Sequence, residues 1–141
     1  VSDGSITVFG EPVRNNSDLY RRIGVMSEHE TVYQFMKGRE FVKMMGSLKG
    51  VKNLDTAVDK AISLVDLADA AHRPMGTYSR GMRQRMRLAA TLVHDPEILI
   101  LDEPLNGADP RQRVHFQNLL KQLASEGRTI VLSSLQSAAW G

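Results

Sequence analysis

The chain has 141 residues, with 18 lysines and arginines against 16 aspartates and glutamates, so its formal net charge is +2. A composition of 42% apolar and 24% charged residues is typical of a folded globular protein and excludes intrinsic disorder. The absence of cysteine excludes a disulfide scaffold and a thiolate metal site, and it fits a reducing compartment. This length predicts one domain, or part of one.

Membrane insertion and nucleic-acid binding are not expected from the sequence. The longest charge-free stretches are far shorter than the roughly 18 apolar residues that a membrane span needs. The first residues, VSDGSITVFG, lack the basic region and the apolar run of a signal peptide. We therefore expect any membrane role to come through a partner. A net charge of +2 is a weak field for attracting nucleic acid.

The first half of the chain predicts two short strands followed by a helical region. The alternation in SITVFG is typical of a half-exposed strand, and RRIGVM at 21–26 is a second short apolar run, so a parallel sheet could begin here. From Gln34 to about Leu67 the pattern is helical, with Asp55 as the expected N-cap. The apolar residues of this region recur at helical spacing: Val58, Ala61, Ile62 and Val65.

Five of the seven methionines lie in this helical region or just beyond it, and they admit two interpretations. An unbranched, polarizable side chain fills irregular gaps in a core, and the same property suits a surface that binds a partner. The sequence favours core packing. The five are Met36, Met44, Met45, Met82 and Met86.

A helix and a buried strand follow. An apolar stripe predicts a helix over about 80–94, starting just after Ser79, and Pro96 then breaks the chain. The run Ile-Leu-Ile-Leu at 98–101 has no polar member, which is typical of a strand buried on both faces of a parallel sheet. The stripe consists of Met82, Met86, Ala89 and Val93.

A second helix and strand complete the pattern. Residues 111–125 predict a helix that Gly127 stops, and residues 129–133 predict another buried strand. The apolar positions of this helix are Val114, Leu119, Leu120 and Leu123. Strand, helix and strand joined by short turns imply a crossover connection and an α/β sheet.

Two adjacent acids follow the predicted strand at 98–101. In open α/β sheets ligands bind beyond the carboxyl ends of the strands. Asp102 is placed there to hold Mg²⁺ through water, because Mg²⁺ keeps most of its hydration. Glu103 would point elsewhere and could orient or deprotonate an attacking water. The alternative is that both acids are simply solvated at the start of a loop.

Charge is unevenly distributed around these acids. Residues 71–94 contain five arginines and no acid, whereas residues 95–110 contain five acids and no lysine or arginine. One interpretation is a solvated helix face on which the two blocks partly pair. The other is an anion site at the start of the helix, where Ser79, Arg80 and Gly81 offer a hydroxyl and backbone N–H groups at the positive end of the helix dipole.

Three ordered motifs now resemble one family. They are YSRGMRQR at 78–85, ILILDEP at 98–104 and NGADP at 106–110, and together they resemble the ATP-binding cassette (ABC) ATPases. The resemblance covers nearly the whole chain and implies a P-loop NTPase-like α/β fold with a mostly parallel sheet. It implies a helical subdomain at about 34–80, and core segments at 1–33 and 81–135. After these, the tail at 136–141 departs from the family.

The resemblance implies roles for residues on two motifs. Ser79 and Gly81, with Arg80 between them, would contact the γ-phosphate of an ATP held by the opposite subunit. The family's usual pattern is Leu-Ser-Gly-Gly-Gln, so Tyr78, Arg80 and Met82 are departures, while the serine and the close-approach glycine are kept. Asp109 matches the D-loop acid that helps join the two subunits.

The resemblance also implies a set of carboxylates. Asp102 would be the Walker B residue associated with Mg²⁺, and Glu103 would be the catalytic carboxylate that positions water. Glu28 stands where the family's Q-loop glutamine lies, and a glutamate there keeps an oxygen for the metal while adding charge.

Two departures concern the nucleotide site. Leu135 stands where the switch histidine is expected, and leucine cannot hydrogen-bond a phosphate. None of the 11 glycines is followed by lysine, so the chain contains no complete G-x-x-x-x-G-K-[ST] phosphate loop. In the family that loop and the aromatic that stacks on adenine would precede Val1. We therefore expect a domain truncated at both ends that binds ATP weakly or not at all on its own.

The resemblance implies an ATPase with ATP and Mg²⁺ as cofactors. Its site would be shared between two head-to-tail subunits beneath a transmembrane permease, at the cytoplasmic face of the inner or plasma membrane. One alternative is a soluble ABC ATPase of translation or DNA repair, in which the arginine block would touch nucleic acid. Another is a non-catalytic fragment that competes for a complete subunit. The transported substrate and the direction of transport do not follow from the sequence.

Overall fold

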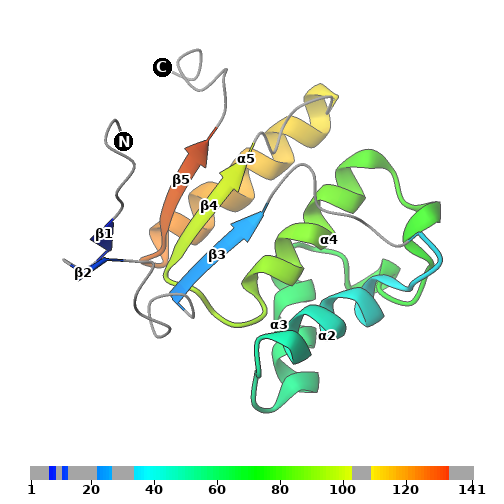
Figure 1. Ribbon diagram of the computed structural model, residues 1–141. Helices are drawn as coiled ribbons and strands as arrows, with labels where there is room; N and C mark the ends of the chain where they lie inside the picture. The colour runs from blue at the N-terminus through cyan, green and yellow to red at the C-terminus, as the bar shows by residue number, and fades with distance from the viewer. Residues whose placement is uncertain (1–6, 9–10, 13–21, 27–33, 103–108, 134–141) are drawn as a thin grey trace.

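A parallel sheet lies beside a group of helices in the computed structural model (Figure 1). The sheet has the order β3-β4-β5, from β3 (Ile23–Met26), β4 (Ile98–Asp102) and β5 (Thr129–Ser133). Both strand pairs are parallel, as expected for α/β architecture. The structure describes residues 7–8, 11–12, 22–26, 34–102 and 109–133.

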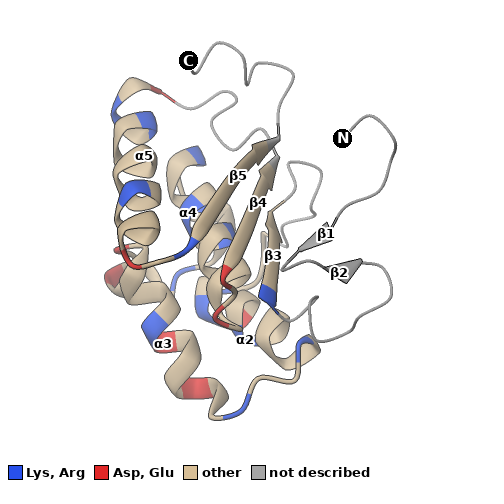
Figure 2. Cartoon of the chain, turned by 90° about the vertical axis from the view of Figure 1, so that its left-hand side faces the viewer, with Lys and Arg blue, Asp and Glu red and all other residues tan. Residues whose placement is uncertain are grey.

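Helices cover one face of this sheet. Helix α4 (Arg80–Leu92) packs against β3, and α5 (Pro110–Ser125) packs against β5, and in Figures 1 and 2 both lie on the same side of the strands. On that side Leu99 and Leu101 of the central strand are fully buried. The expected order of strand, helix and strand from β4 through α5 to β5 is confirmed.

The other face of the sheet is not covered by the described helices. Val25 and Val131 are 58% and 44% exposed, and both are register neighbours of Ile100. In the described part of the chain, the strand predicted at 98–101 is therefore not buried on both faces, since Ile98 and Ile100 are only partly buried. The buried strand predicted at 129–133 is likewise exposed at Val131. An unbroken apolar run reveals how apolar a strand is, but not which layers cover it.

The start of the chain also differs from expectation. Strand β1 (Thr7–Val8) pairs antiparallel with β2 (Glu11–Pro12), and this pair forms a sheet of its own. Of the two runs where a parallel sheet could begin, SITVFG contributes β1 to this separate pair, and RRIGVM contributes β3 to the parallel sheet. The parallel sheet begins with β3.

The helical region consists of two helices and two short 3₁₀ turns before α4. They are α2 (Gly38–Leu48), α3 (Leu54–Leu64), η2 (Ala68–Ala70) and η3 (Met75–Thr77). The break between α2 and α3 contains Gly50 and Asn53, both with positive φ, and Asn53 is the N-cap of α3. The prediction of Asp55 as N-cap is wrong, because the left-handed turn at Asn53 starts the helix earlier.

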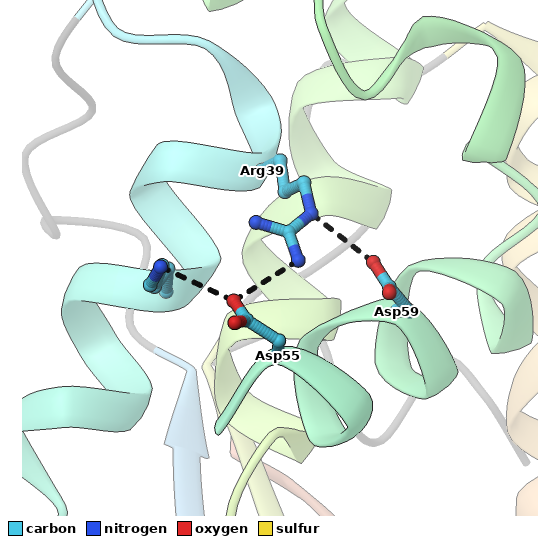
Figure 3. Close-up of polar contacts among 4 residues, drawn as sticks. Arg39, Asp55 and Asp59 are labelled. Atoms are coloured by element: carbon cyan, nitrogen blue, oxygen red, sulfur yellow. Dashed lines mark hydrogen bonds and ion pairs between the residues drawn. The ribbon is translucent and has the colours of Figure 1, made fainter. Parts of the chain in front are cut away.

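Asp55 instead joins α3 to α2 (Figure 3). Arg39 on α2 donates hydrogen bonds to Asp55 at 3.2 Å and to Asp59 at 3.1 Å, and Lys43 lies 3.1 Å from Asp55. The hydrogen bonds to Asp59 and Asp55 raise the pKa of Arg39, and the ion pairs with Lys43 and Arg39 lower the pKa of Asp55. These contacts clamp the two helices at the surface.

One continuous core joins the helices to the sheet. The predicted apolar residues of α3 and its C-cap are all buried, as are those of α4 and its C-cap, apart from the partly buried Met82. They are Val58, Ala61, Ile62 and Val65 in the first set, and Met86, Ala89 and Val93 in the second. Met44, Met45 and Met82 pack against this core, which supports the core interpretation of the methionines. In α5 the predicted positions Leu119, Leu120 and Leu123 are buried, whereas Val114 is 55% exposed. Phe116, which was not predicted, is buried as well.

No helix in the described part of the chain is long and apolar enough to span a bilayer.

Candidate nucleotide site

The start of α4 is built around Ser79. Ser79 is the N-cap residue, with φ −66° and ψ 166°, and its Oγ accepts a hydrogen bond from the Met82 N–H at 3.1 Å. The predicted start of the helix just after Ser79 is confirmed. Ser79 and Arg80 are exposed, and the first turn carries no acid. An exposed hydroxyl and backbone N–H groups at the positive end of a helix dipole suit a phosphate oxygen.

Tyr78 fixes the segment that leads into this turn. Its side chain is buried, and its hydroxyl donates a hydrogen bond to the Ala70 carbonyl at 2.5 Å. Burial raises the pKa of Tyr78. Gly38 lies against the ring, and a Cβ there would overlap the Tyr78 hydroxyl. The tyrosine at this departure from the family pattern therefore ties the start of α4 to α2 and η2.

Three arginines of the arginine-rich block hold the loops around α4. The buried Arg85 guanidinium donates to the Val65 carbonyl at 3.1 Å, and its burial lowers its pKa. Arg83 donates to the Tyr78 carbonyl at 3.2 Å. Arg73 donates to the Thr77 carbonyl at 2.9 Å and lies over the Tyr78 ring. These guanidinium groups bind the protein's own carbonyls.

Two described acids of the acidic block lie near arginines outside the arginine-rich block. Asp95 lies 2.8 Å from Arg128, and Glu97 lies 3.9 Å from Arg22. Partial pairing between the two blocks stays a prediction, because these two contacts concern only Asp95 and Glu97. The first turn of α4 itself contains no acidic residue. An anion there would meet no negative side chain from that turn.

Asp109 caps α5. Its Oδ1 accepts a hydrogen bond from the Gln112 N–H at 2.9 Å, and the side chain is exposed. Gln112 then reaches α4, because a Cβ on Gly81 would overlap its side chain, with Cγ at 2.5 Å. The structure thus brings Ser79, Gly81 and Asp109 to one region through Gln112. Sequence analysis missed Gln112, since nothing local marks a contact between residues so far apart along the chain.

The predicted carboxylates are placed only in part. Asp102 ends the central strand β4, and its backbone is in register with Ser133 of β5. This is the carboxyl edge of the sheet, where a Mg²⁺ ligand is expected. Glu103 and Glu28 lie outside the described residues, as does Leu135.

A separate cleft of about 740 Å³ lies between α3 and α5. Its lining includes Lys60, Ser63, Arg111 and His115, and neither Ser79 nor Gly81 contributes to it. The cleft is therefore distinct from the region at the start of α4.

Comparison with known proteins identifies the class. The model of the ABC transporter family matches residues 1–106, so the chain belongs to this family. The described α/β fold, with its parallel sheet and helical unit, is consistent with a P-loop NTPase-like ABC domain.

Several ATP-binding proteins of this family are similar to the chain. An uncharacterized ABC transporter ATP-binding protein, YhcH of Bacillus subtilis, is 36% identical over 95% of the chain and 44% of its own length. The bacitracin transport ATP-binding protein BcrA of Enterococcus faecalis is 36% identical over 94% and 44%. The daunorubicin/doxorubicin resistance protein DrrA of Streptomyces peucetius is 38% identical over 93% and 41%. The chain spans less than half the length of these relatives.

Proposed function

We propose that this chain forms part of an ATPase subunit that powers an ABC transporter, and that it contributes the signature turn to an ATP held by a second subunit. The observation that carries the proposal is the start of α4. There, an exposed serine caps a helix whose first turn has no acid. A phosphate oxygen at this point would meet a hydroxyl, backbone N–H groups and a favourable dipole.

Ser79, Arg80 and Gly81 have separate roles in this proposal. The Ser79 Oγ accepts from Met82 and keeps its own proton to donate to a γ-phosphate oxygen. Arg80 adds positive charge beside it. Gly81, in the first turn of α4, would offer its backbone N–H to the phosphate.

The carboxylates would hold Mg²⁺ and position the attacking water. When bound, Mg²⁺ would neutralise negative charge on the phosphates. Asp102 would hold it through water at the end of β4, with Glu28 as a further ligand, and Glu103 would position the attacking water. Asp109 would contact the opposite subunit while it caps α5.

The proposed setting is a head-to-tail pair of ATPase subunits under a transmembrane permease, on the cytoplasmic face of a membrane. BcrA, DrrA and a fluoroquinolones export ATP-binding protein of Mycobacterium tuberculosis carry names tied to antibiotics, which supports export of a drug-like molecule as the coupled process. The nucleic-acid alternative receives less support, because Arg73, Arg83 and Arg85 bind backbone carbonyls of the chain itself.

A trans-complementation assay tests this proposal. The reporter is a complete BcrA subunit whose own signature serine is replaced by arginine, so that reporter pairs cannot complete a site. Adding the 141-residue chain should restore ATP hydrolysis, since the chain supplies Ser79. The Ser79→Arg chain should give at least about tenfold less stimulation, in line with the loss of one donor to developing charge.

Ser47→Ala provides the matched control, because Ser47 is an exposed serine on α2. This variant should stimulate the reporter as well as the unchanged chain does. Equal stimulation by the Ser79→Arg chain, or none by any folded form of the chain, would contradict the proposal.

A further inference from the structure

Gln112 lies between the two segments that the proposed function assigns to the subunit interface. Its backbone N–H is held by the Asp109 carboxylate at 2.9 Å, in the first turn of α5. Its side chain packs against Gly81, in the first turn of α4. One residue therefore touches both the cap of α5 and the signature turn of the same chain.

The contact with Gly81 leaves no room for a Cβ at position 81 unless the Gln112 side chain shifts. A Cβ there would overlap Oε1, Cδ and Cγ of Gln112. The overlap involves most of the Gln112 side chain rather than its far end alone. Gly81 is accordingly buried, although its neighbours Ser79 and Arg80 are exposed. Within the chain, the space beside Gly81 is filled by Gln112.

The Gln112 side chain packs against Gly81 without a hydrogen bond from a described residue to its Oε1. Its Oε1 is buried and has no hydrogen-bond partner among the described residues. A buried acceptor without a partner weakens the fold, so this oxygen does not explain why the side chain lies here. What the side chain contributes is a filled gap between α5 and the first turn of α4.

We propose that Gln112 is a positioning residue that braces the signature turn against α5, so that the cap at Asp109 and the phosphate-binding turn at Ser79 and Gly81 move as one unit. This inference rests on the proposed function, because the braced turn is the one that would meet the nucleotide of the second subunit. A shorter side chain at position 112 leaves the turn unsupported, while its hydrogen bond from Met82 to Ser79 can still form.

The contact itself is tested by a double-substitution cycle on urea unfolding of the 141-residue chain. Gly81→Ala should lower the unfolding midpoint because the new methyl overlaps Gln112. In the Gln112→Ala background the same change should have a smaller effect, since the overlapping atoms are gone. Additive effects would show that the two residues do not meet, and would overturn the inference.

The positioning role is tested with the reporter subunit. Gln112→Ala should raise the chain concentration that gives half-maximal ATPase stimulation by about tenfold, which corresponds to ~1.4 kcal/mol and lies within the usual coupling between contacting residues. Gln112→Met keeps the length of the side chain without the orphan oxygen, so it should restore the original concentration. Gln122→Ala, an exposed glutamine on the same helix, should have no effect.

The outcomes separate this inference from the proposed function. Stimulation by the unchanged chain together with an equally active, folded Gln112→Ala chain would overturn the positioning role alone. If Gln112→Met does not restore stimulation, the amide must act through hydrogen bonds. That result would overturn the proposal that Gln112 supports the turn by packing. No stimulation by the unchanged chain would remove the proposed function, and the inference with it.

Discussion

Tyr78 shows how a single side chain positions the candidate site. It stands directly before the N-cap of α4, and its buried hydroxyl bonds the carbonyl of Ala70. The ring also fills the space left by Gly38. The start of α4 is therefore fastened to the helical unit through one aromatic residue.

Removing the hydroxyl should weaken this attachment. Tyr78→Phe leaves the Ala70 carbonyl without its donor, and we expect a loss of about 1 kcal/mol in the free energy of unfolding. Urea denaturation at neutral pH measures it.

Above about pH 10 the unchanged chain should lose stability, because the raised pKa keeps Tyr78 protonated in the fold while the unfolded chain ionises. A Tyr78→Phe chain that loses as much stability at high pH would contradict this account.

His94 gives the chain a second pH dependence. Its Nε2 lies 3.0 Å from the Ile23 carbonyl oxygen. Burial lowers the pKa of His94, and the charge of Lys49 lowers it further. The hydrogen bond to Ile23 and the charge of Asp95 raise the pKa, but they do not offset the burial. Below about pH 6.5 the unfolded chain takes up a proton that the folded chain resists. Stability should therefore fall as the pH drops from 6.5 towards the lowered pKa.

The His94→Gln variant isolates this effect, because glutamine can still donate to the Ile23 carbonyl but does not titrate. Unfolding midpoints measured at about pH 7.5, 6.5 and 5.5 should fall less steeply for the variant than for the unchanged chain. Equal slopes would show that other groups cause the acid sensitivity.

At the scale of elements, the sequence predicted those helix ends that a capping residue or a glycine marks. Ser79 and the apolar stripe gave the start of α4, and Gly127, with φ 98°, ends α5 as expected. The N-cap of α3 was predicted at Asp55 rather than at Asn53, because the apolar pattern does not mark the left-handed turn at Asn53. The Gln112 contact was missed because it depends on how α5 packs on α4.

The surface clamp between α2 and α3 should contribute little and should depend on salt. Arg39→Met removes the hydrogen bonds to Asp55 and Asp59, so the urea midpoint should fall slightly at low ionic strength. The difference should shrink at about 1 M NaCl, where the screening length is only ~3 Å. Arg113→Met on the exposed side of α5 is the control. A salt-independent loss would indicate that Arg39 acts through packing instead.

At the scale of the whole molecule, the described helices pack on one face of the sheet and leave the other face uncovered. Leu99 and Leu101 are covered by helices, whereas Val25 and Val131 are largely exposed. The α/β class and the ABC family could be predicted from motifs, because each motif is a short run of residues. The roles of Glu28 and Glu103, which lie outside the described residues, stay predictions.

The chain on its own should bind ATP poorly. It contains no Gly-Lys pair, so it lacks the loop of backbone N–H groups and lysine that cradles phosphates in this class of NTPase. Calorimetric titration with ATP and Mg²⁺ should show no binding in the low-micromolar range. Nanomolar or low-micromolar ATP binding by the isolated chain would contradict the proposal that the nucleotide is held by a second subunit.

The central claim is that the start of α4 meets a nucleotide held by another subunit, and nucleotide-dependent association tests it most directly. The affinity of the chain for a complete BcrA subunit is measured with and without a non-hydrolysable ATP analogue and Mg²⁺. The account predicts that the analogue tightens binding and that Ser79→Arg abolishes this gain, while Ser47→Ala preserves it. An affinity that does not change with the analogue, or a gain that survives Ser79→Arg, would contradict the claim.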